Sequence, residues 1–132
     1  MADEQEQKTI SQPLVVVVVD DDESVRESLP DLLKEFGFTV VAFSSADEFL
    51  LSNSVDRTMC LVLDIVMPGM SGLDLQKELK SRGYKIPIIF ITAQRDEAVR
   101  KRVLEQGAVD VLLKPFSDIA LRGALSKAMG ET

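Results

Sequence analysis

The chain has 132 residues, of which 45% are hydrophobic, and its 22 acidic and 15 basic side chains give a formal net charge of −7. This length predicts one domain with a buried core, and the acidic balance argues against direct nucleic-acid binding, which depends on Lys and Arg to neutralise phosphates. The single cysteine and the absence of histidine exclude intrachain disulfides, cysteine zinc clusters and Ser-His-Asp or Cys-His catalysis.

The predicted elements begin after a polar start. Residues 1–12 are expected to be a flexible tail and residues 13–130 the single domain. The start lacks a signal-peptide pattern, and no apolar stretch is long enough to span a bilayer, so a cytoplasmic protein is expected. In chain order, strands are predicted over 14–19, 39–43, 59–64, 86–92 and 109–113. Helices are predicted over 23–36, a short segment capped by Ser45, 73–82, 96–106 and 118–129.

The first strand contains five consecutive valines, which is typical of a strand buried on both faces of a parallel sheet. Glycines 37, 83 and 107 are predicted to end three of the helices. Pro30 conflicts with the helix around it, because it removes a backbone donor, and is expected to kink or loosen that helix. Strands that alternate with helices predict an α/β fold, with a parallel sheet covered by helices on both faces.

Three acids, Asp20, Asp21 and Asp22, follow the first strand directly. Carboxylates this close repel one another and lose hydration if they are crowded, and a fold tolerates this when a cation lies among them. The alternative is that one acid caps the next helix and the others are solvated. The segment alone leaves both interpretations open.

The other strand ends also carry polar side chains. Asp64 ends the third strand, Thr92 ends the fourth, where Ala93 follows, and Lys114-Pro115 follows the fifth. In open α/β sheets the carboxyl ends of the strands form the functional edge, so these side chains are expected to lie close together. Taken singly, Lys114 is more often a solvated lysine and Thr92 a strand-end residue. Lys114-Pro115 is either a simple turn or a cis peptide.

Together these side chains form a consistent set for phosphoryl transfer. Mg²⁺ takes oxygen ligands, which Asp21 and Asp64 can supply directly while Asp20 holds a bound water. A phosphoryl group on Asp64 would be an acyl phosphate. The ammonium of Lys114 would neutralise its oxygens, and the hydroxyl of Thr92 would bind one of them. Pro68, Gly69 and Gly72 predict that the loop after Asp64 keeps a fixed path with a close backbone approach.

Four motifs carry a family resemblance through their order and spacing: Asp20-Asp21, Asp64 within D-x-x-M-P-x-x-x-G, Thr92-Ala93 and Lys114-Pro115-Phe116. In these motifs the chain resembles the receiver domain of two-component response regulators, from about residue 14 to residue 129. The resemblance implies a flavodoxin-like (βα)5 three-layer sandwich with strand order 2-1-3-4-5.

The resemblance also implies a mechanism. Asp64 would accept a phosphoryl group from a histidine of a sensor histidine kinase or a histidine phosphotransfer protein. Mg²⁺ would be bound by Asp21, Asp64 and the backbone carbonyl of Val66, with Asp20 acting through water. Such a domain promotes only its own phosphorylation and dephosphorylation and is not otherwise an enzyme.

One position departs from the family pattern. Receivers commonly have Tyr or Phe three residues before the lysine, as an aromatic switch, and this chain has Val111. We expect the smaller side chain to leave a groove near the helix at 96–106 and the strand at 109–113. The similarity looks closest to receivers that precede a LuxR-type helix-turn-helix output domain, and implies a homodimer through that helix, that strand and the last helix.

The alternatives differ in class. A stand-alone receiver would act by protein–protein interaction or in a phosphorelay. A small Mg²⁺-dependent phosphatase would carry a second Asp two residues after its nucleophile, where this chain has Val66. A pseudo-receiver is disfavoured because every site residue is present. A flavin protein of this topology is disfavoured because acids would repel the phosphate after the first strand.

Overall fold

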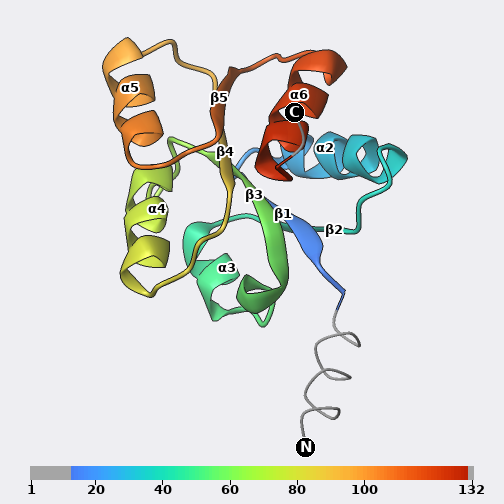
Figure 1. Cartoon of the computed structure of the whole chain (residues 1–132), viewed down its shortest axis with the longest axis horizontal. Coiled ribbons are helices and arrows are strands. Elements are labelled where there is room, and N and C mark those ends of the chain that lie inside the picture. Colours follow the sequence, from blue (N-terminus) through green and yellow to red (C-terminus); the bar gives the residue numbers. More distant parts are fainter. Residues whose placement is uncertain (1–12, 131–132) are drawn as a thin grey trace, which may run out of the picture.

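The computed structural model describes residues 13–130 and is shown in Figure 1. The predicted tail at residues 1–12 lies outside the described part. Five parallel strands form one sheet in the order β2-β1-β3-β4-β5, so the predicted order is confirmed. The strands are β1 (Val15–Val19), β2 (Val40–Phe43), β3 (Thr58–Asp64), β4 (Ile88–Thr92) and β5 (Asp110–Leu113).

Helices cover both faces of the sheet. They are α2 (Glu23–Glu35), α3 (Ala46–Leu51), α4 (Gly72–Ser81), α5 (Glu97–Glu105) and α6 (Asp118–Ala128), with a 3₁₀ turn, η1 (Val55–Arg57). Figure 1 shows α3, α4 and α5 on one side of the sheet and α2 and α6 on the other. The molecule is therefore the three-layer α/β sandwich that the alternation of elements predicts.

The valines of β1 divide between two cores. Val15, Val17 and Val19 pack in the core beneath α3, α4 and α5, and Val16 and Val18 pack in the core beneath α2 and α6. All five are at most 1% exposed. Successive side chains of a strand point to opposite faces, so only an uninterrupted apolar run can serve two cores.

Most elements begin or end one or two residues from their predicted bounds, and three features of the observed elements are informative. Helix α2 runs through Pro30, as the predicted span 23–36 implies, and Leu29 and Leu33 on either side of it are buried. Strand β4 begins at Ile88 rather than at residue 86, since Pro87 offers a carbonyl but no donor to the ladder. The 3₁₀ turn was not predicted from the sequence.

The loop after β3 follows a fixed path, as Gly69 and Gly72 predict. Gly69 has a φ of 75°, in the left-handed region that favours glycine. A Cβ at Gly72 would collide with the carbonyl oxygen of Asp64, and the Gly72 amide donates to the carbonyl of Ile65 over 2.9 Å. The start of α4 is thereby packed directly beneath the end of β3.

Candidate functional site

The acids at the ends of β1 and β3 come together at one edge of the sheet. The two strands are parallel neighbours in which Val19 is paired with Leu63, so Asp20 and Asp64 leave the sheet side by side. One carboxylate oxygen from each of Asp20, Asp21 and Asp64 lies within 4.8 Å of the other two. This spacing suits a shared hard cation, so the residues present fit a Mg²⁺ ion.

Asp20 is the acid most fully bound by the protein. Its side chain is buried, one oxygen accepts the Asp22 amide over 2.9 Å, and the other accepts the Lys114 ammonium over 2.8 Å. The Arg26 guanidinium also donates to its backbone carbonyl over 3.0 Å. Asp21, in contrast, is exposed. This difference fits the predicted roles, in which Asp21 is a direct ligand and Asp20 acts through water.

Lys114 reaches the site from the end of β5, on the far side of β4. Its ammonium lies 3.8 Å from Asp64, farther than from Asp20. Its backbone amide donates to the Thr92 carbonyl over 2.7 Å, which fixes the start of the loop. The Lys114–Pro115 peptide is cis, the second of the two alternatives that the sequence left open.

The environment of Asp64 favours its neutral form. Burial, and after it the negative charge of Asp20, raise the pKa of its carboxyl, and the Lys114 ammonium lowers it, so that the pKa moves from 3.8 to about 7. Without an added cation, the carboxyl is therefore harder to ionise than that of an ordinary Asp. A cation among the three acids would favour the ionised, nucleophilic form.

Thr92 lies at the end of β4, next to the acids, but its hydroxyl is engaged elsewhere. Its oxygen accepts the Gln94 amide over 3.1 Å, and its O–H lies 3.3 Å from the Gln94 carbonyl as a donor. Thr92 is buried and Ala93 is exposed. The hydroxyl thus holds the loop between β4 and α5 in this structure.

Asp22 has the capping role that the sequence left as an alternative for one of the three acids. It is the N-cap of α2, where its carboxylate accepts the Ser24 amide over 2.9 Å and the Ser24 hydroxyl over 2.8 Å. These hydrogen bonds hold the pKa of its carboxyl below the usual value. The capping interpretation therefore holds for Asp22, and the carboxylates of Asp20 and Asp21 are left available to a cation.

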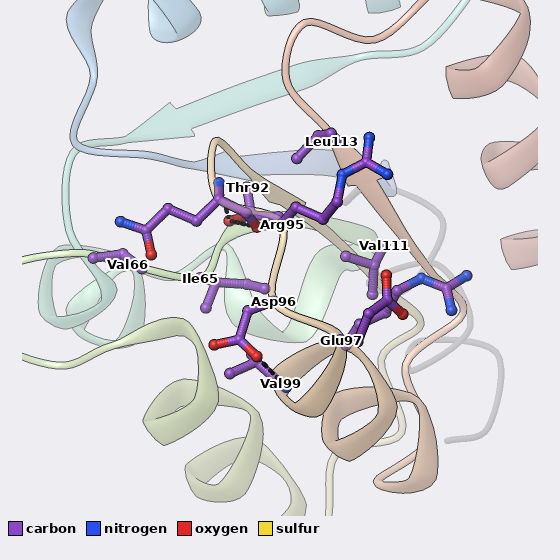
Figure 2. Close-up of a pocket in the computed structure, with 11 residues that line it drawn as sticks. Ile65, Val66, Thr92, Arg95, Asp96, Glu97, Val99, Val111 and Leu113 are labelled. Atoms are coloured by element: carbon purple, nitrogen blue, oxygen red, sulfur yellow. Dashed lines mark hydrogen bonds between the residues drawn. The ribbon is translucent and has the colours of Figure 1, made fainter.

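Val111 borders the groove that its small side chain predicts. A cavity of about 220 Å³ lies between β5 and the start of α5, and Figure 2 shows Val111 in its wall. Val66, whose carbonyl is a predicted ligand, is 57% exposed, and its side chain borders the same cavity. Cys60 is fully buried, and burial raises the pKa of its thiol to about 12.

Sequence reasoning missed two residues at this edge. Arg26 holds the turn after β1 through the Asp20 carbonyl, and Gln94 holds the Thr92 hydroxyl through its backbone. A basic residue one turn into the helix after an acidic loop would have been the only signal for Arg26. The contact of Gln94 is made by its main chain and leaves no signal in the sequence.

Comparison with known proteins identifies the class of protein that this fold and site define. Residues 16–126 match the family model of the response regulator receiver domain. The chain belongs to this family, whose members bind Mg²⁺ at an acidic pocket, are phosphorylated by histidine kinases and act as regulatory domains rather than as classical enzymes.

Individual relatives agree with this assignment. The chain is 50% identical to nodulation protein W of Bradyrhizobium diazoefficiens over 114 residues (86% of this chain and 50% of the relative). It is 40% identical to the transcriptional regulatory protein FixJ of Azorhizobium caulinodans over 119 residues (90% and 56%). The crystal structure of FixJ-N superposes with a TM-score of 0.80 at 37% identity, covering 92% of this chain and 97% of that one.

The chain thus spans about half the length of these curated relatives. Within residues 13–130, no helix is both long enough and apolar enough to cross a membrane.

Proposed function

We propose that Asp64 accepts a phosphoryl group from a phosphohistidine of a partner histidine kinase or histidine phosphotransfer protein. The observation that carries this proposal is the convergence of Asp20, Asp21 and Asp64 around one point, with the Lys114 ammonium 2.8 Å from Asp20 and 3.8 Å from Asp64. Because this chain contains no histidine, a phosphohistidine donor would have to belong to the partner.

The step is a substitution at phosphorus. A carboxylate oxygen of Asp64 forms a bond to phosphorus, the bond between phosphorus and the donor imidazole nitrogen breaks, and that nitrogen takes a proton from solvent. The product is an acyl phosphate on Asp64. Because Asp64 has a raised pKa, the reaction requires groups that favour its ionised form, and Lys114 is one of them.

The carboxylates of Asp21 and Asp64 and the backbone carbonyl of Val66 would hold Mg²⁺, with Asp20 acting through a water molecule. A bound Mg²⁺ neutralises charge on the phosphoryl oxygens and favours the ionised form of the acceptor carboxylate. Its expected ligands are oxygen atoms, as this hard cation prefers.

Lys114 and Thr92 complete the site. The Lys114 ammonium is 3.8 Å from Asp64, so it would reach a phosphoryl oxygen on that residue with a small side-chain movement. Thr92 would give up its two contacts with Gln94 and donate its hydroxyl to another phosphoryl oxygen. The exposed Ala93 leaves room beside it.

The test is phosphorylation by acetyl phosphate with Mg²⁺, followed by intact-protein mass spectrometry. The wild type should gain one phosphoryl group, and Asp64→Asn should gain none. Asp47→Asn, an exposed acid in the first turn of α3, is the matched control and should be labelled like the wild type. Persistent labelling of Asp64→Asn would refute the assignment of the acceptor.

The output of the switch is proposed from the relatives. One of them is a transcriptional regulatory protein, which supports a transcriptional output. In that case a LuxR-type helix-turn-helix domain would bind DNA, and the receiver domain itself would not. We expect phosphorylation to promote a homodimer through α5, β5 and α6. A receiver that works alone, by protein–protein interaction or in a phosphorelay, would instead pass its phosphoryl group to a histidine phosphotransfer protein or stay monomeric in sedimentation velocity experiments.

A phosphatase acting on metabolites is the second class. It is disfavoured because the position two residues after Asp64 is the apolar Val66, which cannot act as an acid or a base. Rapid turnover of p-nitrophenyl phosphate with Mg²⁺ would favour the phosphatase over the receiver.

A further inference from the structure

The cavity beside Val111 shares a wall with the proposed phosphorylation site. Its volume is about 220 Å³, and its apolar lining comes from Ile65, Val66, Val99, Val111 and Leu113. Thr92 also lines it. A movement of Thr92 toward a phosphoryl group on Asp64 would therefore change the wall of this cavity directly.

The Arg95 side chain lines this cavity. Figure 2 shows it running from the loop after β4 toward Leu113 on β5. Arg95 is exposed, and the ion pairs found between residues 13 and 130 all involve other side chains. Its position thus depends on the path of the loop and on the packing of its aliphatic stem.

The path of that loop is controlled by Thr92. The Thr92 hydroxyl makes both of its hydrogen bonds with the main chain of Gln94, the residue directly before Arg95. The hydroxyl cannot keep this geometry and also bind a phosphoryl oxygen. Phosphorylation would consequently release the main chain next to Arg95.

The C-terminal end of α5 is anchored to α4, which limits a shift to the loop after β4 and the first turn of α5. The buried side-chain amide of Gln76 on α4 donates to the carbonyl of Val103 over 3.2 Å, and Val103 is fully buried. At the other end of the helix, residues 93–98 are exposed, and the Asp96 carboxylate caps the helix. The loop and the first turn of α5 can shift while its last turn stays on α4.

We propose that Arg95 covers the Val111 cavity in the unphosphorylated protein and that phosphorylation of Asp64 uncovers it. This inference rests on the proposed function. Thr92 would draw the loop toward Asp64 and away from β5, and the added negative charge of the phosphoryl group would attract the guanidinium in the same direction. The side chains of Val99 and Val111, which are half-buried here, would then join the exposed Leu113 in one apolar surface, so the switch needs no aromatic residue at position 111.

The experiment uses a thiol reporter in the cavity. Val111→Cys replaces one small side chain with another, and the only native thiol, Cys60, is fully buried and remains protonated, so it gives little background. The rate of labelling by a small maleimide is measured with and without acetyl phosphate and Mg²⁺. Phosphorylation should increase the rate several-fold. Leu113→Cys, at a partly exposed position, is a second reporter if the first variant does not fold.

Variants of Arg95 then test its role in each reporter background. Arg95→Ala should be labelled rapidly in both states and lose the response, and Arg95→Lys should keep most of it. Arg102→Ala removes the same charge from an exposed position of α5 that does not line the cavity, and should respond like the unmodified reporter. Thr92→Ala should be phosphorylated, more slowly, without any increase in labelling.

The mass of each sample shows whether Asp64 is phosphorylated, so a failure of the proposed function can be told apart from a failure of the role of Arg95. Samples that carry no phosphoryl group on Asp64 would contradict the proposed function. Fully phosphorylated samples with unchanged labelling rates, or an Arg95→Ala variant that keeps the response to phosphorylation, would overturn the role of Arg95 and leave the proposed function intact.

Discussion

Lys114 donates to Asp20, 94 positions away in the sequence, over 2.8 Å, and this ion pair joins the two ends of the site. The Asp20 side chain is fully buried there, and that of Lys114 is 19% exposed. A buried carboxylate needs a cation or several hydrogen-bond donors close by. Lys114 therefore stabilises the buried Asp20 carboxylate when no metal is bound, in addition to its proposed role toward the phosphoryl group.

Removal of this cation should therefore destabilise the protein. Lys114→Met leaves the Asp20 carboxylate buried without its charged partner, and we expect the free energy of unfolding to fall by about 3 kcal/mol. Urea denaturation without divalent cations measures this. Lys127→Met removes the exposed partner of Asp110 and should change stability by less than about 1 kcal/mol. Equal losses in the free energy of unfolding for the two substitutions would show that the buried Asp20 pair stabilises the protein no more than the exposed Asp110 pair.

The raised pKa of Asp64 gives stability a pH dependence of known sign. The folded-state pKa of about 7 exceeds the ordinary value of 3.8, so the folded protein binds more protons than the unfolded chain between these values. Asp64 therefore contributes most to the free energy of unfolding below about pH 4. This contribution falls as pH rises toward 7, and it no longer changes at higher pH.

Asp64→Asn removes this dependence. The variant should be more stable than the wild type at pH 8 by roughly 1–3 kcal/mol, and the difference should shrink as pH falls toward 4. Thermal or urea denaturation across this range, without Mg²⁺, measures it. A difference that is the same at pH 4.5 and at pH 8 would contradict the raised pKa.

Gly72 should be intolerant of a side chain. A Cβ there would collide with the carbonyl of Asp64, which is backbone and cannot move aside without shifting the acceptor. Gly72→Ala should lower the free energy of unfolding by about 2 kcal/mol or more and weaken Mg²⁺ binding.

Gly123→Ala is the matched control. Gly123 lies within α6, and a Cβ there would meet no atom within 4 Å. Alanine has the higher helix propensity, so this substitution should stabilise the protein by about 0.5–1 kcal/mol. If Gly72→Ala were as well tolerated, the close approach of α4 to the end of β3 would be wrong.

The apolar side chain of Val66 predicts a long-lived phosphoryl group. It is exposed beside the site but has no polar atom to orient an attacking water. After removal of acetyl phosphate, the acyl phosphate should decay over minutes or longer, as followed by mass spectrometry. Val66→Asn should shorten the lifetime, while Leu51→Asn, a change of similar polarity at an exposed position of α3, should not. Decay of the wild type within seconds would contradict the prediction.

Much of the fold could be predicted because local pattern and tertiary structure agree. The valine run of β1, the helix caps Ser45 and Asp22, and the positive φ of Gly37 each follow from residue chemistry within a few positions. At Pro30 the apolar periodicity, which predicted a helix through this position, agrees with the observed α2 despite the low helix propensity of proline.

The sequence by itself determined which chemical groups this protein brings to one edge of its sheet, since a parallel α/β order places the ends of all strands together. Only the tertiary structure decided how those groups are used. Lys114 is bound to Asp20 more closely than to Asp64, and Thr92 holds Gln94. These contacts depend on which side chains can reach one another across neighbouring strands and on which of them are shielded from water, and neither is encoded in local spacing.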